Sequence, residues 1–115
     1  MITIKSHGFK FSRPEANFVF DVSYLVNPWR DPEVRAGRKT AEECMNEQEG
    51  FRAIVDAIAN VVIQYHKLFP EENYQVAICC SAGEYRSPAT ARAVGKILAQ
   101  HHIEHVLNVD GERTM

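Results

Sequence analysis

The amino-acid sequence contains no long apolar run. None approaches the roughly 20 residues that a membrane-spanning helix requires, and the first residues, MITIKSHGFKF, lack the apolar core of a signal peptide. We therefore expect a cytoplasmic protein that makes no contact with a membrane. Cysteine is also scarce, with three in the chain. Cys79 and Cys80 are neighbours, and a disulfide between them would close a strained ring, so we expect reduced thiols.

The chain has little excess charge. Its 115 residues are 45% hydrophobic and 24% charged, with a formal net charge of -2 at pH 7. This balance is typical of a compact globular domain and predicts no general attraction to nucleic acid or to an anionic membrane. Repeats, low-complexity segments and Gly/Ser linkers are absent from the sequence, so residues 1–115 are predicted to form a single domain.

Histidines cluster near the end of the chain, at His101, His102 and His105. No cysteine or carboxylate stands at a spacing that would complete a metal site with them. We interpret them as the end of a helix, where a histidine suits the helix dipole, and we expect neither a metal nor a cofactor.

Alternating pieces of predicted strand and helix indicate an α/β domain. The succession of strand, loop, helix and strand in the second half of the chain implies a right-handed crossover and a parallel strand pair. We expect one small domain with a mixed sheet, flanking helices and a phosphate-binding loop between a strand and a helix. Ser87 is the predicted N-cap of the second helix and Pro88 its first residue. The predicted strands span residues 2–11, 17–25, 73–80 and 103–110, the predicted helices residues 51–69 and 88–100, and an exposed, basic loop residues 27–40.

The stretch CSAGEYRS lies between a predicted buried strand and a predicted helix, where open α/β sheets bind their ligands. The first amides of the helix have no internal partners, and the helix dipole favours an anion there. Gly83, after the small residues Ser81 and Ala82, allows successive amides to turn inward. Arg86 adds a planar fork that can grip two phosphate oxygens. The sequence therefore predicts a site for phosphate or another oxyanion.

Cys80 has two interpretations at the mouth of this loop. The surrounding amides and Arg86 would favour its thiolate, and the hydroxyl of Ser81 or Ser87 could donate a hydrogen bond to the sulfur, which would make Cys80 an activated nucleophile. Alternatively, a cysteine at the end of a buried strand is a small core residue. We expect the latter of Cys79, whose side chain should point to the opposite face of the sheet.

The spacing of Cys80, Arg86 and Ser87 is similar to the loop of the low-molecular-weight tyrosine phosphatases. That resemblance implies that Cys80 forms a phosphocysteine, that Arg86 holds the equatorial oxygens, and that an aspartate protonates the leaving group. The match is local, because the loop of that family lies near the N-terminus. The candidate acids are Asp21, Asp31, Asp56 and Asp110.

A longer resemblance begins at the other end of the chain. The run SHGFKFSRPEANFVFDVSYLVNP resembles the start of the C-terminal domain of the RNase adapter family RapZ, with a Gly-Phe-Lys segment, a Phe-Asp-Val strand and an Asn-Pro turn. That family continues with a long helix, a buried strand and the loop Gly-Cys-Thr-Gly-Gly-x-His-Arg-Ser, which stands here at residues 79–87. Order and spacing agree over residues 4–109. The first run matches at Gly8, Phe9, Lys10, Phe20, Asp21, Val22, Leu25, Asn27 and Pro28.

The RapZ resemblance implies a pocket for a phosphorylated amino sugar such as glucosamine-6-phosphate. Asp21 and Asn27, at a neighbouring strand end, would reach the sugar hydroxyls. In full-length members this domain also binds small regulatory RNA and assists an endoribonuclease, while a separate N-terminal domain carries an ATP-binding P-loop. No Gly-x4-Gly-Lys-Ser/Thr pattern occurs in this sequence, so ATP hydrolysis by that route is not supported. The phosphate would be held by Cys80, Ser81, Ala82, Gly83, Glu84, Tyr85, Arg86 and Ser87.

Three of the departures from the RapZ pattern bear on the ligand. Tyr85 stands where the family has histidine, Ala82 where it has the first of two glycines, and Ser23 where it has arginine. The loss of a cation and of a titratable ring weakens the case for the same sugar phosphate. The last residues, NVDGERTM, lack the basic tail that helps that family hold RNA. The basic residues that remain for RNA are Arg30, Arg35, Arg38 and Lys39.

We predict a module that binds the phosphate of a small metabolite and acts as a sensor or adapter. A cysteine-dependent phosphatase and an RNA-binding adapter are the alternatives. An aspartate over the loop would favour the phosphatase, and a basic groove leading away from the loop would favour RNA. Trp29, beside Pro28, is a candidate for stacking on a sugar or a base, although such a tryptophan more often covers the core.

Overall fold

The computed structural model describes residues 1–109, and a sheet of four strands lies at its centre. The strands are β1 (Ile2–Gly8), β2 (Phe18–Asp21), β3 (Tyr74–Cys80) and β4 (His105–Asn108). Their spatial order is β2-β3-β1-β4, and every neighbouring pair is parallel. The predicted α/β class is therefore confirmed.

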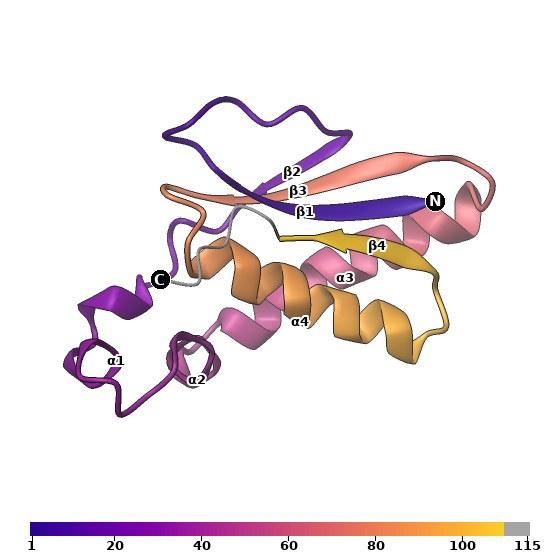
Figure 1. Cartoon of the computed structure of the whole chain (residues 1–115). Coiled ribbons are helices and arrows are strands. Elements are labelled where there is room, and N and C mark those ends of the chain that lie inside the picture. The colour runs from indigo at the N-terminus through magenta and orange to yellow at the C-terminus, as the bar shows by residue number, and fades with distance from the viewer. Residues whose placement is uncertain (110–115) are drawn as a thin grey trace.

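This sheet is parallel throughout its described strands rather than mixed, because β1 and β2 do not form a hairpin. Residues 9–17 leave the carboxyl end of β1 and return to its amino end, arching over the sheet on the side away from the long helices (Figure 1). The return is held by Lys5 Nζ, which donates to the Glu15 carbonyl at 2.7 Å, and by the Asn17 amide, which donates to the Gln75 carbonyl at 3.0 Å. The chain therefore enters β2 beyond β3 and in the same direction.

The long helices α3 (Phe51–Leu68) and α4 (Arg86–Gln100) cover one face of the sheet (Figure 1). The first was predicted from its apolar spacing and the second from a serine followed by proline at a helix start, and α4 starts two residues before the predicted position 88. Their inward side chains pack on the alternate strand residues that share that face, and this packing forms the core. None of the helices within residues 1–109 is long and apolar enough to cross a membrane. The fully buried members of the core include Ile2, Ile4, Val55, Val62, Val76, Ile78 and Leu98.

Residues 27–47 contain helical turns where the sequence predicted a loop at 27–40. They form η1 (Pro28–Arg30), α1 (Pro32–Arg35) and α2 (Ala41–Glu47). Each begins at a residue whose side chain accepts a hydrogen bond from a main-chain amide, namely Asn27, Asp31 and Thr40. The prediction of an irregular loop was wrong because proline was taken as a breaker, whereas at the first position of a helix it fits the backbone.

The buried hydroxyl groups of Ser6 and Thr90 differ in whether they are hydrogen-bonded, and we therefore expect their removal to have opposite effects on stability. Ser6 Oγ is buried without a hydrogen-bond partner in residues 1–109, whereas Thr90 Oγ1 donates to the Arg86 carbonyl at 2.7 Å. Ser6→Ala removes an unsatisfied polar group and is expected to raise the free energy of unfolding by about 1 kcal/mol. Thr90→Val removes a satisfied one and is expected to lower it by about 1 kcal/mol. Urea unfolding of both variants checks this, and shifts of the same sign would contradict it.

Candidate functional site

The loop of residues 81–85 connects the carboxyl end of β3 to the amino end of α4, as the sequence predicted. Its backbone is pressed against the end of β1. A Cβ placed on Gly8 would lie 2.5 Å from the main-chain carbon and oxygen of Ala82, and one placed on Gly83 would lie 2.9 Å from the Gly8 nitrogen. Gly83 also has a φ of 73°, which side-chain-bearing residues rarely adopt. Only glycine at both positions permits this approach.

Main-chain hydrogen bonds extend the same contact. The Phe9 amide donates to the Cys80 carbonyl at 2.9 Å, and the Lys10 amide donates to the Ser81 carbonyl at 3.0 Å. The carbonyls at the start of the loop therefore point toward β1 and are satisfied there. These bonds use the carbonyls of Cys80 and Ser81, and no amide of residues 81–87 donates to β1.

The main-chain amides of the loop are unoccupied. From residue 81 to residue 87, none donates a hydrogen bond to an acceptor within residues 1–109. Tyr85 occupies the N-cap position of α4, and no side chain caps the helix. Consecutive free amides at a helix start, around a glycine with positive φ, form a concave surface of partial positive charge. Such a surface suits an oxyanion.

Ser87 is not the helix cap, and that prediction was wrong. It is the second residue of α4 and is fully buried, with its Oγ accepting from the Cys80 Sγ at 3.3 Å. The hydroxyl is thus turned toward β3, which prevents it from reaching an amide of its own helix turn. Cys80 is 2% exposed and belongs to the apolar core. The contact between Cys80 and Ser87 therefore joins the end of β3 to the first turn of α4.

Cys79 points to the other face of the sheet, as alternation predicts. It is in register with His7 on β1 and Asp21 on β2, so these three side chains share a row. Burial raises the pKa of the Cys79 thiol to about 11, with a smaller contribution from the negative charge of Asp21. Cys79 is therefore a protonated, unreactive thiol near neutral pH.

Arg86 links the loop to the turn that follows β2. Its Nη1 donates to the Ser23 carbonyl at 2.7 Å and to the Leu25 carbonyl at 3.2 Å. Within residues 1–109, Nε and Nη2 of Arg86 have no hydrogen-bond partner. One nitrogen of the guanidinium thus has a structural role that the sequence did not indicate, while the others keep donors for a ligand.

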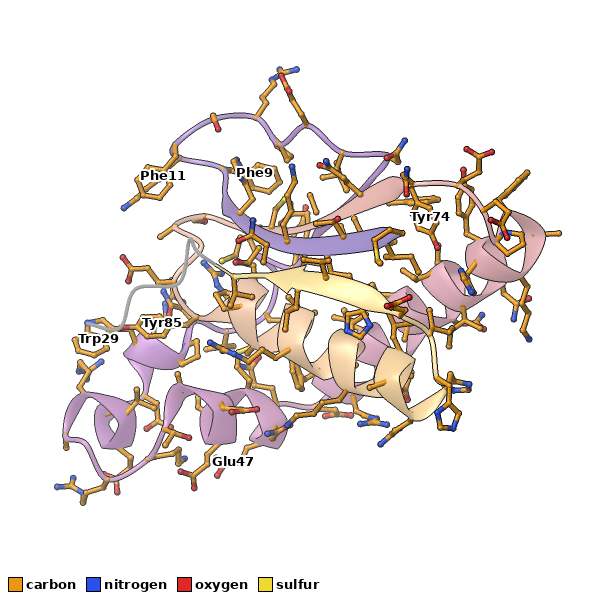
Figure 2. The ribbon with its side chains drawn as sticks, turned by 45° about the vertical axis from the view of Figure 1, so that its right-hand side comes forward. Phe9, Phe11, Trp29, Glu47, Tyr74 and Tyr85 are labelled. Atoms are coloured by element: carbon orange, nitrogen blue, oxygen red, sulfur yellow. The ribbon has the colours of Figure 1, made fainter. Side chains whose placement is uncertain are left out.

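A hollow of about 410 Å³ adjoins the loop and is lined by Asn27, Trp29, Glu84 and Tyr85. The rings of Trp29 and Tyr85 lie side by side (Figure 2), parallel to within 1° and with centroids 6.2 Å apart. Trp29 is held by its amide, which donates to Asn27 Oδ1 at 3.0 Å, and by its carbonyl, which accepts from Arg35 Nη1 at 2.7 Å. The structure therefore brings Asn27 close to the loop, as the sequence predicted.

Two of the four basic residues of the segment 27–40, Arg38 and Lys39, are paired with carboxylates. Lys39 Nζ lies 3.0 Å from Asp31 Oδ2 and 2.7 Å from Glu47 Oε1, and Arg38 Nη2 lies 2.7 Å from Glu33 Oε2. The hydrogen bond from Lys39 lowers the pKa of Asp31, and the bonds to Glu47 and Asp31 raise the pKa of Lys39. These ion pairs hold the segment that carries Trp29 in place. They also leave fewer unpaired positive charges in it for the phosphates of RNA.

Three of the candidate general acids of a phosphatase mechanism contact other groups. Asp21 Oδ1 accepts from the Ser23 amide at 2.9 Å, and Asp21 lies on the sheet face away from Cys80. Asp31 caps α1 and contacts Lys39, while Asp56 pairs with Arg52 at 3.0 Å. Asp110 lies outside the described residues. Sequence spacing selected none of these residues, and each of the three described ones is engaged by another group.

Another hollow, of about 470 Å³, lies at the amino ends of β1 and β3, where Met1, Asn73 and Gln75 are among its lining residues. It is at the end of the sheet remote from the loop, and the terminal amine of Met1 donates into it to Asn73 Oδ1 at 2.7 Å. Parallel sheets bind ligands at their carboxyl ends. The loop and the neighbouring aromatic pair are therefore the candidate site.

Comparisons with known proteins show which family shares this sequence. The family model described as RapZ C-terminal domain matches residues 1–110. A "Nucleotide-binding protein" of Dictyoglomus thermophilum is 32% identical over 98% of this chain and 41% of its own length. One of Dichelobacter nodosus is 34% identical over 91% of this chain and 42% of its own length. The chain thus spans about two fifths of the length of these relatives.

Proposed function

The chain belongs to the RapZ C-terminal domain family, and on that basis we propose that it binds the phosphate group of a small phosphorylated ligand in the loop of residues 80–87. In this role it acts as a metabolite sensor or adapter. The observation that carries the proposal is the set of main-chain amides from residue 81 to residue 87, which have no acceptor within residues 1–109. Residues 82–87 are buried or half-buried, a setting in which free amides favour an acceptor, and a phosphate offers several oxygens at once.

The remaining groups around the loop suit the same ligand. Arg86 contributes the donors that its contacts with Ser23 and Leu25 leave free. Asn27 lies beside the loop and is placed to contact the organic part of the ligand, such as a sugar hydroxyl. Asp21 ends β2 on the face of the sheet opposite Cys80, and its Oδ1 accepts from Ser23, whose carbonyl accepts from Arg86, so we propose a contact with the ligand only at the edge of the site. A phosphosugar is one ligand of this description.

The relatives' name, nucleotide-binding protein, bears on the ligand in a limited way. It refers to proteins more than twice as long as the part that this chain matches. A nucleotide carries a phosphate, so the name is compatible with the loop. It leaves open which part of those proteins binds the nucleotide.

A cysteine-dependent phosphatase is the second candidate, and the contact of Cys80 with Ser87 favours it. The sulfur lies 3.3 Å from the Ser87 hydroxyl, a group that could stabilise a thiolate. However, Cys80 is 2% exposed, so an oxyanion in the loop meets the amides before the sulfur. Asp21, Asp31 and Asp56 each have another partner. We therefore place binding before catalysis.

An RNA-binding adapter is the third candidate. The net charge of -2 provides no general attraction to RNA. Lys39 and Arg38 are neutralised by carboxylates, and Arg35 donates to the Trp29 carbonyl.

Thermal unfolding with ligands tests the proposal. Inorganic phosphate, vanadate and glucosamine-6-phosphate are each expected to raise the melting temperature in a saturable manner, since a ligand at 100 times its Kd stabilises by about 2.7 kcal/mol. Sodium chloride at matched ionic strength is expected to have little effect. Para-nitrophenyl phosphate should not be hydrolysed.

Two results would contradict this proposal in different ways. The absence of stabilisation by every phosphate compound would remove the phosphate site itself. Turnover of para-nitrophenyl phosphate that disappears in Cys80→Ser would show that the sulfur attacks phosphorus and would place the phosphatase first. Cys44→Ser is the matched control, because Cys44 is a buried thiol in α2 and not part of the loop.

A further inference from the structure

We propose that the phosphate loop serves a nucleotide, whose base stacks on the Trp29 and Tyr85 rings and whose edge is recognised by Glu84, with guanine preferred. This inference rests on the proposed phosphate site and adds the class of ligand. The hollow of about 410 Å³ beside the loop carries it. Its volume lies within the roughly 300–1,000 Å³ typical of small-molecule sites.

The aromatic pair has the form of a stacking platform. Trp29 and Tyr85 come from segments far apart in the sequence, yet their rings are parallel to within 1° and line one hollow (Figure 2). Trp29 is 51% exposed, so it is not the core-covering tryptophan that the sequence also allowed. Flat aromatic faces that remain exposed in a hollow suit a planar base, because every nucleobase has a π face.

Tyr85 connects the two halves of the site. Its amide belongs to the unoccupied set at the start of α4, while its ring lines the hollow. A nucleotide presents the same pair of features, a phosphate and a planar ring separated by one ribose. The contacts of Arg86 with the Ser23 and Leu25 carbonyls hold the Asn27–Trp29 segment beside the loop, so both halves are fixed relative to each other.

Glu84 explains the preference for guanine. Glu84 lines the hollow, and its carboxylate has no ion pair within residues 1–109, which is unusual in a loop that attracts anions. Two carboxylate oxygens match the adjacent N1–H and N2–H donors of guanine, whereas the corresponding edge of adenine has one donor group. Asn27 uses Oδ1 for the Trp29 amide, so its Nδ2 is directed elsewhere and can donate to guanine O6.

The fluorescence of Trp29 provides the test, because it is the only tryptophan in the sequence. GMP is expected to quench it in a saturable manner, with a Kd at least ten times lower than those of AMP and glucosamine-6-phosphate. Tyr85→Leu is expected to weaken GMP binding at least tenfold, and Tyr85→Phe, which keeps the ring, should retain it. Glu84→Gln is expected to bring the Kd values of GMP and AMP within about threefold. Thermal shifts with inorganic phosphate accompany each variant and report on the phosphate site separately from the base site.

The outcomes separate this inference from the one on which it rests. Equal affinity for GMP and glucosamine-6-phosphate, with no effect of Tyr85→Leu, would overturn the base site while the phosphate site stands. Failure of inorganic phosphate and of every nucleotide to bind would overturn both. A single-stranded guanine oligonucleotide that binds more tightly than GMP would overturn the mononucleotide assignment in favour of an RNA strand.

Discussion

Gly8→Ala is expected to lower the free energy of unfolding by about 3 kcal/mol and to abolish phosphate binding. The new Cβ would lie 2.5 Å from the main-chain carbon and oxygen of Ala82 and 2.9 Å from the Gly83 nitrogen. Main-chain atoms cannot rotate away as a flexible side chain would. Either the end of β1 or the loop must therefore move, and the loop amides then lose their common direction.

Denaturant unfolding and phosphate titration of the variant measure both effects. Gly37→Ala is the matched control, because Gly37 has a φ of 77° but no atom within 4 Å of an added Cβ. That variant carries a conformational cost of about 1 kcal/mol without a clash, and it should bind phosphate normally. If Gly8→Ala were no less stable than Gly37→Ala, the close packing of β1 against the loop would be contradicted.

Arg86→Met is expected to weaken phosphate binding by at least 100-fold and to destabilise the fold by about 2 kcal/mol. The substitution removes the free guanidinium donors from the site. It also leaves the Ser23 and Leu25 carbonyls without their charged donor, which detaches the turn after β2 from the start of α4. Loss of affinity and loss of stability should therefore appear together.

Arg86→Lys separates these two roles. Lysine keeps the charge but lacks a planar fork that can satisfy two carbonyls and a ligand at once, so partial binding with reduced stability is expected. Arg13→Met serves as the control, since Arg13 is an exposed cation on the segment between β1 and β2. Isothermal titration with phosphate and urea unfolding provide the measurements. Unchanged affinity in Arg86→Met would remove Arg86 from the site.

The sequence predicted the elements that obey a single local rule. Apolar spacing located α3, and the β-branched, apolar run located β3. Small residues followed by Arg86 before a helix indicated the loop, because the physics of helix starts is local. The resemblance to RapZ, which rested on order and spacing along nearly the whole chain, is confirmed by the family match.

The features that were missed depend on contacts between distant segments. One exception is local. Thr40 and Glu43 have the spacing of a capping box at the start of α2, and the two hydrogen bonds of that box are 3.0 and 3.1 Å long. The sequence contained this signal, but it was not used. By contrast, nothing local indicates that Gly8 packs on Gly83. The turn of Ser87 toward Cys80 likewise follows from how α4 lies on the sheet.

The pairing of Trp29 with Tyr85 illustrates the same limit of local rules. Trp29 precedes α1 and Tyr85 precedes α4, and they meet because Arg86 holds the turn after β2 against the start of α4. Tyr85 stands where the RapZ loop pattern has histidine, and the effect of this difference can be interpreted only once Trp29 is known to lie beside it. The parallel rather than mixed sheet has the same origin, since the path of residues 9–17 is fixed by contacts with Gln75 and Lys5.

The central claim is that the free amides of residues 81–87 form an oxyanion site. Titration of the ¹⁵N-labelled protein with inorganic phosphate, followed by amide chemical shifts, tests it most directly. We expect the amides of residues 81–87 to shift together along one saturable curve and those of Gly37 and Gly50 not to shift. Shifts confined to the basic segment 30–39, or none at residues 81–87, would contradict it.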